Sequence, residues 1–284
     1  MGSAAPLVLV TGATGQTGSL VAAGLRERGI ATREVAPNTE ISFDWSDPTG
    51  WGALLEGVTA VYLMTPTDPS FDADAVGKFL ERVQAAGISR MVFLSGCSAE
   101  FGSSWMLSRE MPVRCINEGE LNWTILRPTV FAQNFGPMEP TLIADGGIRR
   151  PLGEGDGAGI SFIDVRDIAD VAVEILTDTS TAHAGKTYYL DGPEVITYGQ
   201  ALRLIGNEIG QLLEYRNMPT EEWADMWRSQ GIAEPMIKWF TWGTAGQRRG
   251  EYAHVRDGVR EVLGRTPRTF QAWVKEAAAD GVWS

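Results

Sequence analysis

Three glycines near the amino end, Gly12, Gly15 and Gly18, have the spacing of a phosphate-binding turn. An apolar run from Val8 to Val10 leads into them, and a segment with helical periodicity follows. In such a turn the glycines allow a tight bend, close backbone approach to a pyrophosphate, and close packing of helix on strand. A helix that begins near Gly15 would direct its free N–H groups at that phosphate. The turn predicts a dinucleotide site that includes Thr14, Gln16 and Thr17.

The rest of the amino-terminal half supplies the elements that would position this turn. Strands are expected at residues 30–35, 41–43, 58–64, 91–94 and 123–126, with helices between them. Such alternation predicts an α/β protein with a doubly wound parallel sheet of the Rossmann type. A surface loop also collects glycines, but a strand before the glycines and a helix after them favour the phosphate-binding turn.

Past residue 128 the alternation breaks down. A strand is expected at 160–163, a helix at 168–176, and a late strand that returns to the sheet at 186–190. Thr197 and Gln200 form a capping box that starts a further helix. We expect a dinucleotide-binding core of residues 1–128, completed by about 160–192. Residues 129–159 and 193–284 would form a smaller, C-terminal substrate-binding lobe interleaved with it.

The composition excludes several classes of function. The formal net charge is −12, and an acidic surface repels nucleic acid and anionic membranes. No apolar run approaches the roughly 20 residues that span a bilayer, and the apolar run before the glycines is too short for a signal peptide. Two cysteines and two histidines offer no disulfide framework and no metal-ligand spacing. We expect a soluble cytoplasmic protein, a monomer or homodimer, that binds a small-molecule substrate.

Several further motifs resemble the NmrA-like branch of the atypical short-chain dehydrogenase/reductase family. They are TGATGQTG at 11–18, LS at 94–95, TILRPT at 124–129, the pair of segments around Phe131 and Asn134, and FIDVRDIA at 162–169. More narrowly, FDW at 43–45, GPEVITY at 192–198 and GRTPRTF at 264–270 resemble the festuclavine/agroclavine dehydrogenase group and its bacterial relatives. The resemblance implies a Rossmann fold and the reduction of a cyclic iminium with NADPH.

The resemblance also implies a set of cofactor contacts. The loop after the fourth strand would lie along the adenosine, which makes Thr65 and Pro66 candidates. Asp44, followed by Trp45, holds the place of the acid that meets the adenine amine, with a solvated helix cap as the alternative. Relatives that use NADPH carry an Arg at the end of the second strand that grips the 2′-phosphate, and Pro37 stands near that place. NADPH is expected over NADH as the cofactor, although Pro37 in place of that Arg argues against NADPH.

The residues favour a hydride acceptor that needs no proton from the enzyme. Typical short-chain reductases polarise a carbonyl with a Tyr hydroxyl whose pKa is lowered by a Lys four residues later. None of the six tyrosines here has a Lys at that spacing. Ketone reduction needs a proton at the developing alkoxide, whereas an iminium is already cationic and accepts hydride without one. For that chemistry the protein needs only to bind, orient and exclude water.

Catalytic candidates lie at the end of the fifth strand and on the following helix. Ser95 and Gly96 end the strand, where ligands sit in doubly wound folds, so Ser95 is expected to bond the nicotinamide ribose or the substrate. Cys97 would touch the substrate as a small apolar side chain rather than as a nucleophile. Arg109 stands where relatives often carry a Lys, and its permanent charge would hold a substrate carboxylate or the cofactor. An exposed Arg beside Glu110 is the alternative.

Two groups of residues are candidates for the substrate pocket. The group after the Arg-Pro pair, with Asn134 as its polar and catalytic member, consists of Phe131, Asn134 and Phe135. The second group, from a tryptophan-rich stretch at 219–250, consists of Trp223, Trp227 and Trp239. These indoles would form a lid and wall over an aromatic or polycyclic substrate. The alternatives are an Asn that bonds its own loop and aromatics at helical spacing that form ordinary core.

Three functions fit these residues. The first is a reductase that transfers hydride from NAD(P)H to an iminium or activated alkene of a specialised metabolite. The second keeps the pocket but has no redox step, as in a cyclase or isomerase, which Pro37 and the aromatic lobe favour. The third is a regulatory protein that senses dinucleotides. Failure to bind NADPH or NADH would exclude the first, and turnover without nicotinamide would indicate the second.

Overall fold

The computed structural model describes residues 6–37, 39–66, 68, 71–117, 121–136, 139 and 141–283. A seven-stranded sheet has the order β3-β2-β1-β4-β5-β6-β9. Its strands are β1 (Leu7–Thr11), β2 (Ala31–Ala36), β3 (Ile41–Ser42), β4 (Ala60–Met64), β5 (Arg90–Leu94), β6 (Asn122–Pro128) and β9 (Lys186–Leu190). Every pairing between neighbours is parallel, which confirms the doubly wound α/β class. Because β1 pairs with both β2 and β4, the strand order reverses at β1, where such folds bind dinucleotides.

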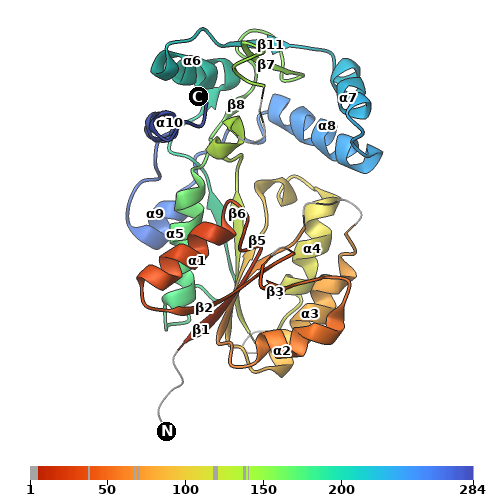
Figure 1. Ribbon diagram of the computed structural model, residues 1–284, viewed down its shortest axis with the longest axis vertical. Coiled ribbons are helices and arrows are strands. Elements are labelled where there is room, and N and C mark those ends of the chain that lie inside the picture. Colours follow the sequence, from red (N-terminus) through yellow and green to blue (C-terminus); the bar gives the residue numbers. More distant parts are fainter. Residues whose placement is uncertain are drawn as a thin grey trace.

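Helices cover both faces of the sheet (Figure 1). α1 (Gly18–Glu27), α5 (Val165–Thr177) and α9 (Gly258–Leu263) lie on one face, and α2 (Trp51–Leu55), α3 (Asp74–Ala85) and α4 (Ser104–Arg114) lie on the other. Alternate residues of a strand point to opposite faces of the sheet. In β1, Val8 and Val10 pack under α1 and α5, whereas Leu9 packs under α2 and α3. Burial on both faces explains the almost continuous apolar runs of these strands.

The remaining elements gather beyond the carboxyl ends of the strands (Figure 1). The helices there are α6 (Tyr198–Ile209), α7 (Thr220–Ser229), α8 (Glu234–Arg248) and α10 (Phe270–Ala279). Two small sheets accompany them, β8 (Gly159–Ile160) with β10 (Ile196–Thr197) and β7 (Gly147–Arg150) with β11 (Glu214–Asn217). Of the short 3₁₀ turns, η2 (Cys97–Ala99) follows β5 and η3 (Ala132–Phe135) follows β6, whereas η1 (Pro48–Gly50) leads into α2. These elements have a core of their own, rich in aromatic rings from η3, α6 and α10.

The expected elements are largely confirmed, with some shifted ends. The late strand at 186–190 pairs with β6 as the seventh strand, and the capping box of Thr197 and Gln200 starts α6. The helix after the glycine turn begins at Gly18, because residues 13–17 are used by the turn itself. The strand expected at 160–163 is only two residues long. The division into core and lobe stays a prediction, and among the described residues no helix could cross a membrane.

A buried carboxylate ties the carboxyl-terminal segment to α5. Asp167 is fully buried and forms ion pairs with Arg265 and Arg268, at 2.7 and 2.5 Å. Arg265 and Arg268 belong to the segment 264–270 that the sequence singled out. Because Asp167 needs both cations to offset the cost of its burial, this contact fixes where α10 starts relative to the sheet.

Candidate functional site

The glycine turn has the geometry that the sequence predicted. Gly12 has a φ of +64°, a conformation that L side chains rarely adopt. The Gly15 N–H donates to the Gly12 carbonyl at 2.9 Å and closes the bend. A β-carbon on Gly18 would lie 2.2 Å from the Gly12 carbonyl oxygen, so only glycine lets α1 approach the turn this closely. The turn thus carries two of the three structural roles of a dinucleotide-binding motif.

The start of α1 is left without a side-chain cap. Thr17 precedes the helix, but its hydroxyl accepts a bond from the Tyr62 hydroxyl at 3.0 Å instead of bonding the first turn. Thr14 and Gln16 are exposed on the turn. An uncapped helix start presents free N–H groups and a positive dipole end, which together bind a phosphate. This arrangement fits the pyrophosphate of a dinucleotide.

The end of β4 is anchored to the glycine turn. The Thr11 hydroxyl accepts from the Met64 N–H at 2.7 Å and can donate to the carbonyls of Tyr62 and Met64. The Met64 methyl group lies 3.5 Å from the place of a β-carbon on Gly15. Thr65 follows as a buried residue and Pro66 as a half-buried one. Their role as adenosine contacts stays a prediction, at the strand-order reversal where the ligand would lie.

The end of β2 presents no guanidinium toward the carboxyl edge. Arg33 reaches the other way and donates to two backbone carbonyls at the end of α2, at 2.6 and 2.8 Å. Glu34 forms an ion pair with Arg26 of α1, and Pro37 is exposed. The described part of β2 therefore lacks the side chain that would grip a 2′-phosphate.

Asp44 and Trp45 lie just after β3. The Asp44 Oδ1 accepts from both the N–H and the hydroxyl of Ser46, each at 2.7 Å, and these bonds hold the pKa of the Asp44 carboxyl below its usual range. Asp44 is therefore not the helix cap named as the alternative, because Asp47 caps η1 through the Thr49 N–H. Contact of Asp44 with an adenine amine stays a prediction. The Trp45 ring packs edge-on in an aromatic cluster with Phe43, Trp51, Phe71 and Phe79.

Ser95 is tied into a buried charge network at the end of β5. Its hydroxyl donates to Glu110 Oε2 at 2.8 Å, and Arg127 donates to both oxygens of the same carboxylate at 2.5 and 3.1 Å. Arg114 adds a further bond at 2.5 Å. Burial alone would raise the pKa of the Glu110 carboxyl, but the bonds from Arg127, Arg114 and Ser95 outweigh it and hold the pKa below its usual range. Ser95 is positioned by this network.

Arg109 is buried, and the expectation of an exposed Arg beside Glu110 is wrong. Its side chain lies between the rings of Phe71 and Trp105, with the guanidinium carbon 4.9 and 4.1 Å from their centres. Its Nη1 and Nη2 donate to the carbonyls of Trp105 and Asp68, at 2.8 and 3.1 Å. Burial lowers the pKa of the Arg109 guanidinium to about 10, so the group stays protonated at neutral pH.

The other pocket candidates are divided between surface and core. Phe131 pairs with Ile163, and Asn134 lies half-buried in η3, whereas the Phe135 ring is buried against Phe162. Trp223 and Trp227 pack together on α7, 5.8 Å between ring centres, with Trp223 buried. Trp239 of α8 packs on Trp105 of α4, with 5.1 Å between centres. Trp239 is linked to Arg109 through their shared contact with Trp105.

Cys97 is buried in η2, and burial raises the pKa of its thiol to about 12. A thiol that stays protonated is no nucleophile, which agrees with the apolar role expected of Cys97. Gly96 is half-buried before it.

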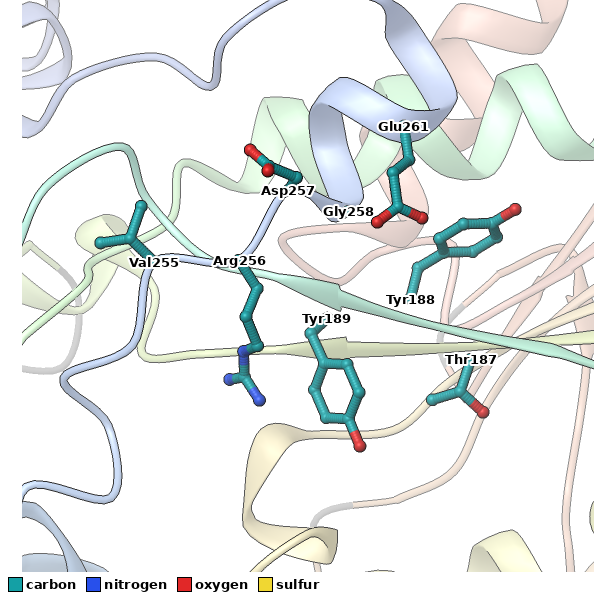
Figure 2. A pocket seen from close by; sticks show the side chains of 8 residues that line it. All are labelled: Thr187, Tyr188, Tyr189, Val255, Arg256, Asp257, Gly258 and Glu261. Carbon is teal, nitrogen blue, oxygen red and sulfur yellow. The ribbon is translucent and has the colours of Figure 1, made fainter.

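A hollow of about 410 Å³ lies at the outer edge of the sheet, along β9 (Figure 2). In it the Arg256 guanidinium lies over the Tyr189 ring at 4.1 Å, and Tyr188 and Glu261 line the side nearer α9. Two strands, β5 and β6, separate β9 from β4 in the sheet order. This hollow contains none of the candidate residues, and it borders the network at Ser95 because Arg127 donates to the Tyr189 hydroxyl at 3.0 Å.

Sequence reasoning missed Glu110 and Trp105 as parts of the site. The sequence identifies Glu110 only as a neighbour of Arg109, yet it is fully buried and accepts from the Ser95 hydroxyl. Trp105 stands four residues before Arg109, a spacing that places both on one helix face and was available in the sequence. The burial of Glu110 depends on Arg127, which arrives from a neighbouring strand, and no local signal reveals it.

Comparisons with known proteins agree with this geometry. The NAD(P)H-binding family model matches residues 12–179. The chain is 30% identical to the (4-alkanoyl-5-oxo-2,5-dihydrofuran-3-yl)methyl phosphate reductase of Streptomyces griseus, over 96% of this chain and 98% of that one. It is 28% identical to prestalk A differentiation protein A of Dictyostelium discoideum, over 95% and 91%. It is 27% identical to agroclavine dehydrogenase of Claviceps fusiformis, over 95% and 96%.

Solved structures share the fold. The Citrobacter sp. triphenylmethane reductase complexed with NADP(H) has a TM-score of 0.75 at 18% identity, over 96% of this chain and 99% of that one. The NADPH-dependent quinone oxidoreductase QOR2 of Escherichia coli, complexed with NADPH, has a TM-score of 0.79 at 18% identity, over 96% and 99%. NmrA, a negative transcriptional regulator in complex with NAD, has a TM-score of 0.74 at 13% identity, over 97% and 98%.

Proposed function

Because the chain belongs to the NAD(P)H-binding family and is an NAD(P)H-dependent oxidoreductase, we propose that it is an NmrA-like reductase of an iminium or activated alkene. Hydride would pass from the nicotinamide to the electron-poor carbon of a specialised metabolite. The glycine turn would hold the pyrophosphate, and the elements beyond the carboxyl ends of the strands would hold the substrate. Relatives named as an agroclavine dehydrogenase and a dihydrofuranyl phosphate reductase support this choice of acceptor.

The single observation that carries the proposal is that the sequence has no Tyr–Lys pair to protonate an alkoxide. No Tyr has a Lys four residues later, and the hydroxyls of the tyrosines are bonded or buried elsewhere. Their partners or states are Thr17 for Tyr62, His183 for Tyr188, Arg127 for Tyr189, Arg150 for Tyr198, two carbonyls for Tyr215, and burial for Tyr252. The Ser95 hydroxyl donates its hydrogen bond to the Glu110 carboxylate. An acceptor that needs no proton fits these residues better than a ketone does.

Binding of the dinucleotide tests the first half of the proposal. Titration of the purified protein with NADPH and with NADH, followed by the fluorescence of the reduced nicotinamide, is expected to saturate at micromolar concentration. An absence of binding of both dinucleotides at millimolar concentration would contradict the proposal. Substrate turnover that continues after bound nucleotide is stripped would indicate a cyclase or isomerase instead.

For the cofactor we propose NADPH, with discrimination against NADH of less than about tenfold, or roughly 1.4 kcal/mol. The reason is that Arg33 is turned away from the carboxyl edge and Pro37 stands at the end of β2. Pro37→Arg is expected to raise the preference for NADPH about tenfold, because a guanidinium bonds a phosphate with two parallel N–H groups. The ratio of the dissociation constants for NADPH and NADH measures this effect. Pro37→Gln, which adds no charge, is the control, and an unchanged ratio in Pro37→Arg would refute the assignment.

A further inference from the structure

Two buried N–H donors beside the candidate site have no acceptor in the described part of the chain. Trp105 and Arg109 lie four residues apart on α4, and the guanidinium carbon of Arg109 lies 4.1 Å from the centre of the Trp105 ring. Arg109 is 2% exposed. Two of its nitrogens donate to backbone carbonyls, but Arg109 Nε and Trp105 Nε1 are buried without a partner among the residues that the structure describes.

Such donors are costly. A buried polar group without a partner loses about 1–3 kcal/mol, and a charged group loses more. Both unsatisfied groups are donors, and one belongs to a permanently charged side chain, so the missing partner is an acceptor and most favourably an anion. Because the guanidinium lies over the indole, the two N–H groups belong to side chains in direct contact, and a carboxylate has two oxygens that could accept one bond from each.

The surroundings of these donors are aromatic. Phe71 covers the Arg109 guanidinium, with 4.9 Å between its ring centre and the guanidinium carbon. Trp239 of α8 packs against the Trp105 ring at 5.1 Å, and both indoles are half-buried. The ring of Trp239 covers a flat aromatic surface beside the donors, and it comes from a helix beyond the sheet (Figure 1). A planar aromatic ring would fit the same surface.

We propose that Trp105 and Arg109 form a subsite for the carboxylate of a planar aromatic substrate, whose ring takes the place of Trp239 against Trp105. The carboxylate would accept from Arg109 Nε and Trp105 Nε1 together. This inference rests on the proposed function, because it specifies the class of substrate that the reductase binds. The subsite would explain why Trp239 of α8 packs against Trp105 and why the charged Arg109 of α4 is buried.

The test compares 2-naphthoate with 2-naphthamide, two probes of the same shape that differ in charge. Calorimetric titration of the protein saturated with NADP⁺ is expected to show 2-naphthoate bound at least about tenfold more tightly, or roughly 1.4 kcal/mol. Trp105→Phe keeps a six-membered ring against Arg109 and removes the N–H group together with the rest of the indole, and Arg109→Met keeps an apolar chain between the two rings. Each variant is expected to lose most of the preference for 2-naphthoate.

Matched controls are Trp123→Phe and Arg149→Met. Trp123 lies in β6 against the α2–α4 layer, and Arg149 is an exposed partner of Glu222, so both variants should keep the preference. Equal binding of the two probes by the unmodified protein would overturn the subsite, and so would a preference that survives in Trp105→Phe. A loss of NADP⁺ affinity in Arg109→Met, with 2-naphthoate binding intact, would assign Arg109 to the cofactor instead. If Arg109→Met does not fold, Trp105→Phe decides alone.

Failure of the subsite can be told apart from failure of the proposed function. Reduction of an iminium that carries no carboxylate, measured in parallel with NADPH, reports on the reductase alone. If that reduction proceeds while the probes bind equally, the reductase stands and the subsite is refuted. If the probes are discriminated but no iminium is reduced, the subsite stands as a binding site and the proposed function is refuted.

Discussion

Gly15→Ala is expected to weaken the binding of NADPH and NADH by about 100-fold or more, which is roughly 2.7 kcal/mol. A β-carbon at this position would lie 3.2 Å from the Gly12 carbonyl oxygen and 3.5 Å from the Met64 methyl group, so the turn can hold it with a shift of a few tenths of an ångström. The new alanine methyl group would occupy the space through which the backbone approaches a pyrophosphate. We therefore expect Gly15→Ala to lose binding and keep its fold. Fluorescence titration measures the binding of the dinucleotide, and circular dichroism measures the fold.

Two other glycines provide the comparison. Gly52→Ala places its β-carbon in open space on α2, so affinity should be unchanged and stability equal or slightly higher. Gly18→Ala brings a β-carbon within 2.2 Å of the Gly12 carbonyl oxygen, and we expect it to lose stability as well as binding. If Gly15→Ala binds NADPH as tightly as the unmodified protein does, the pyrophosphate does not lie on this turn.

Glu110→Ala is expected to lower the free energy of unfolding by about 3–5 kcal/mol, because it leaves Arg127 buried without its counter-ion. The Glu110 side chain is fully buried and that of Arg127 is 8% exposed, so water cannot replace the lost bonds. Urea denaturation followed by tryptophan fluorescence measures the change. Glu174→Ala, which removes an exposed ion pair with Arg28, is the control and should cost less than about 1 kcal/mol. Equal costs for the two variants would contradict the importance of the buried network.

The same carboxylate gives the stability a defined dependence on pH. Since the folded-state pKa of Glu110 lies below its usual value of 4.5, its stabilising effect is fully present above that value. The effect is lost as the pH falls through the lower, folded-state pKa. The difference in unfolding free energy between the unmodified protein and Glu110→Gln should therefore be constant near neutrality and shrink below pH 4.5. If this difference in unfolding free energy grew as the pH falls, the pKa of Glu110 in the folded protein would be raised rather than lowered.

Local patterns were sufficient for the elements that build the nucleotide-binding half. The glycine turn is specified by three residues within one segment, and the strands around it are buried on both faces and nearly all apolar. The capping box of α6 is likewise contained within four residues. The pairing of β7 with β11 could not be predicted in this way. It joins residues near 147 to residues near 214, and β11 is the polar segment EYRN, which has no alternation of its own.

The candidate site was harder to predict because its polar groups are buried by distant partners. Nothing local distinguishes a buried Arg109 from an exposed one, since Phe71 and Asp68 cover it from another loop. Ser95 was identified from its place at the end of a strand, but its hydroxyl is directed by Glu110 from the next helix. Strand ends predict where a site lies, and the long-range contacts decide what each side chain in it can do.

The central claim is that this reductase acts on an acceptor that needs no proton from the protein. The most direct measurement compares two bicyclic substrates of the same shape, the 2-methyl-3,4-dihydroisoquinolinium ion and the ketone 1-tetralone, by the loss of NADPH absorbance. We predict oxidation of NADPH with the iminium, transfer of deuterium from NADPH labelled at C4 to the former iminium carbon, and no measurable rate with the ketone. Reduction of the ketone at a comparable rate would show that the protein supplies a proton, and would contradict the account.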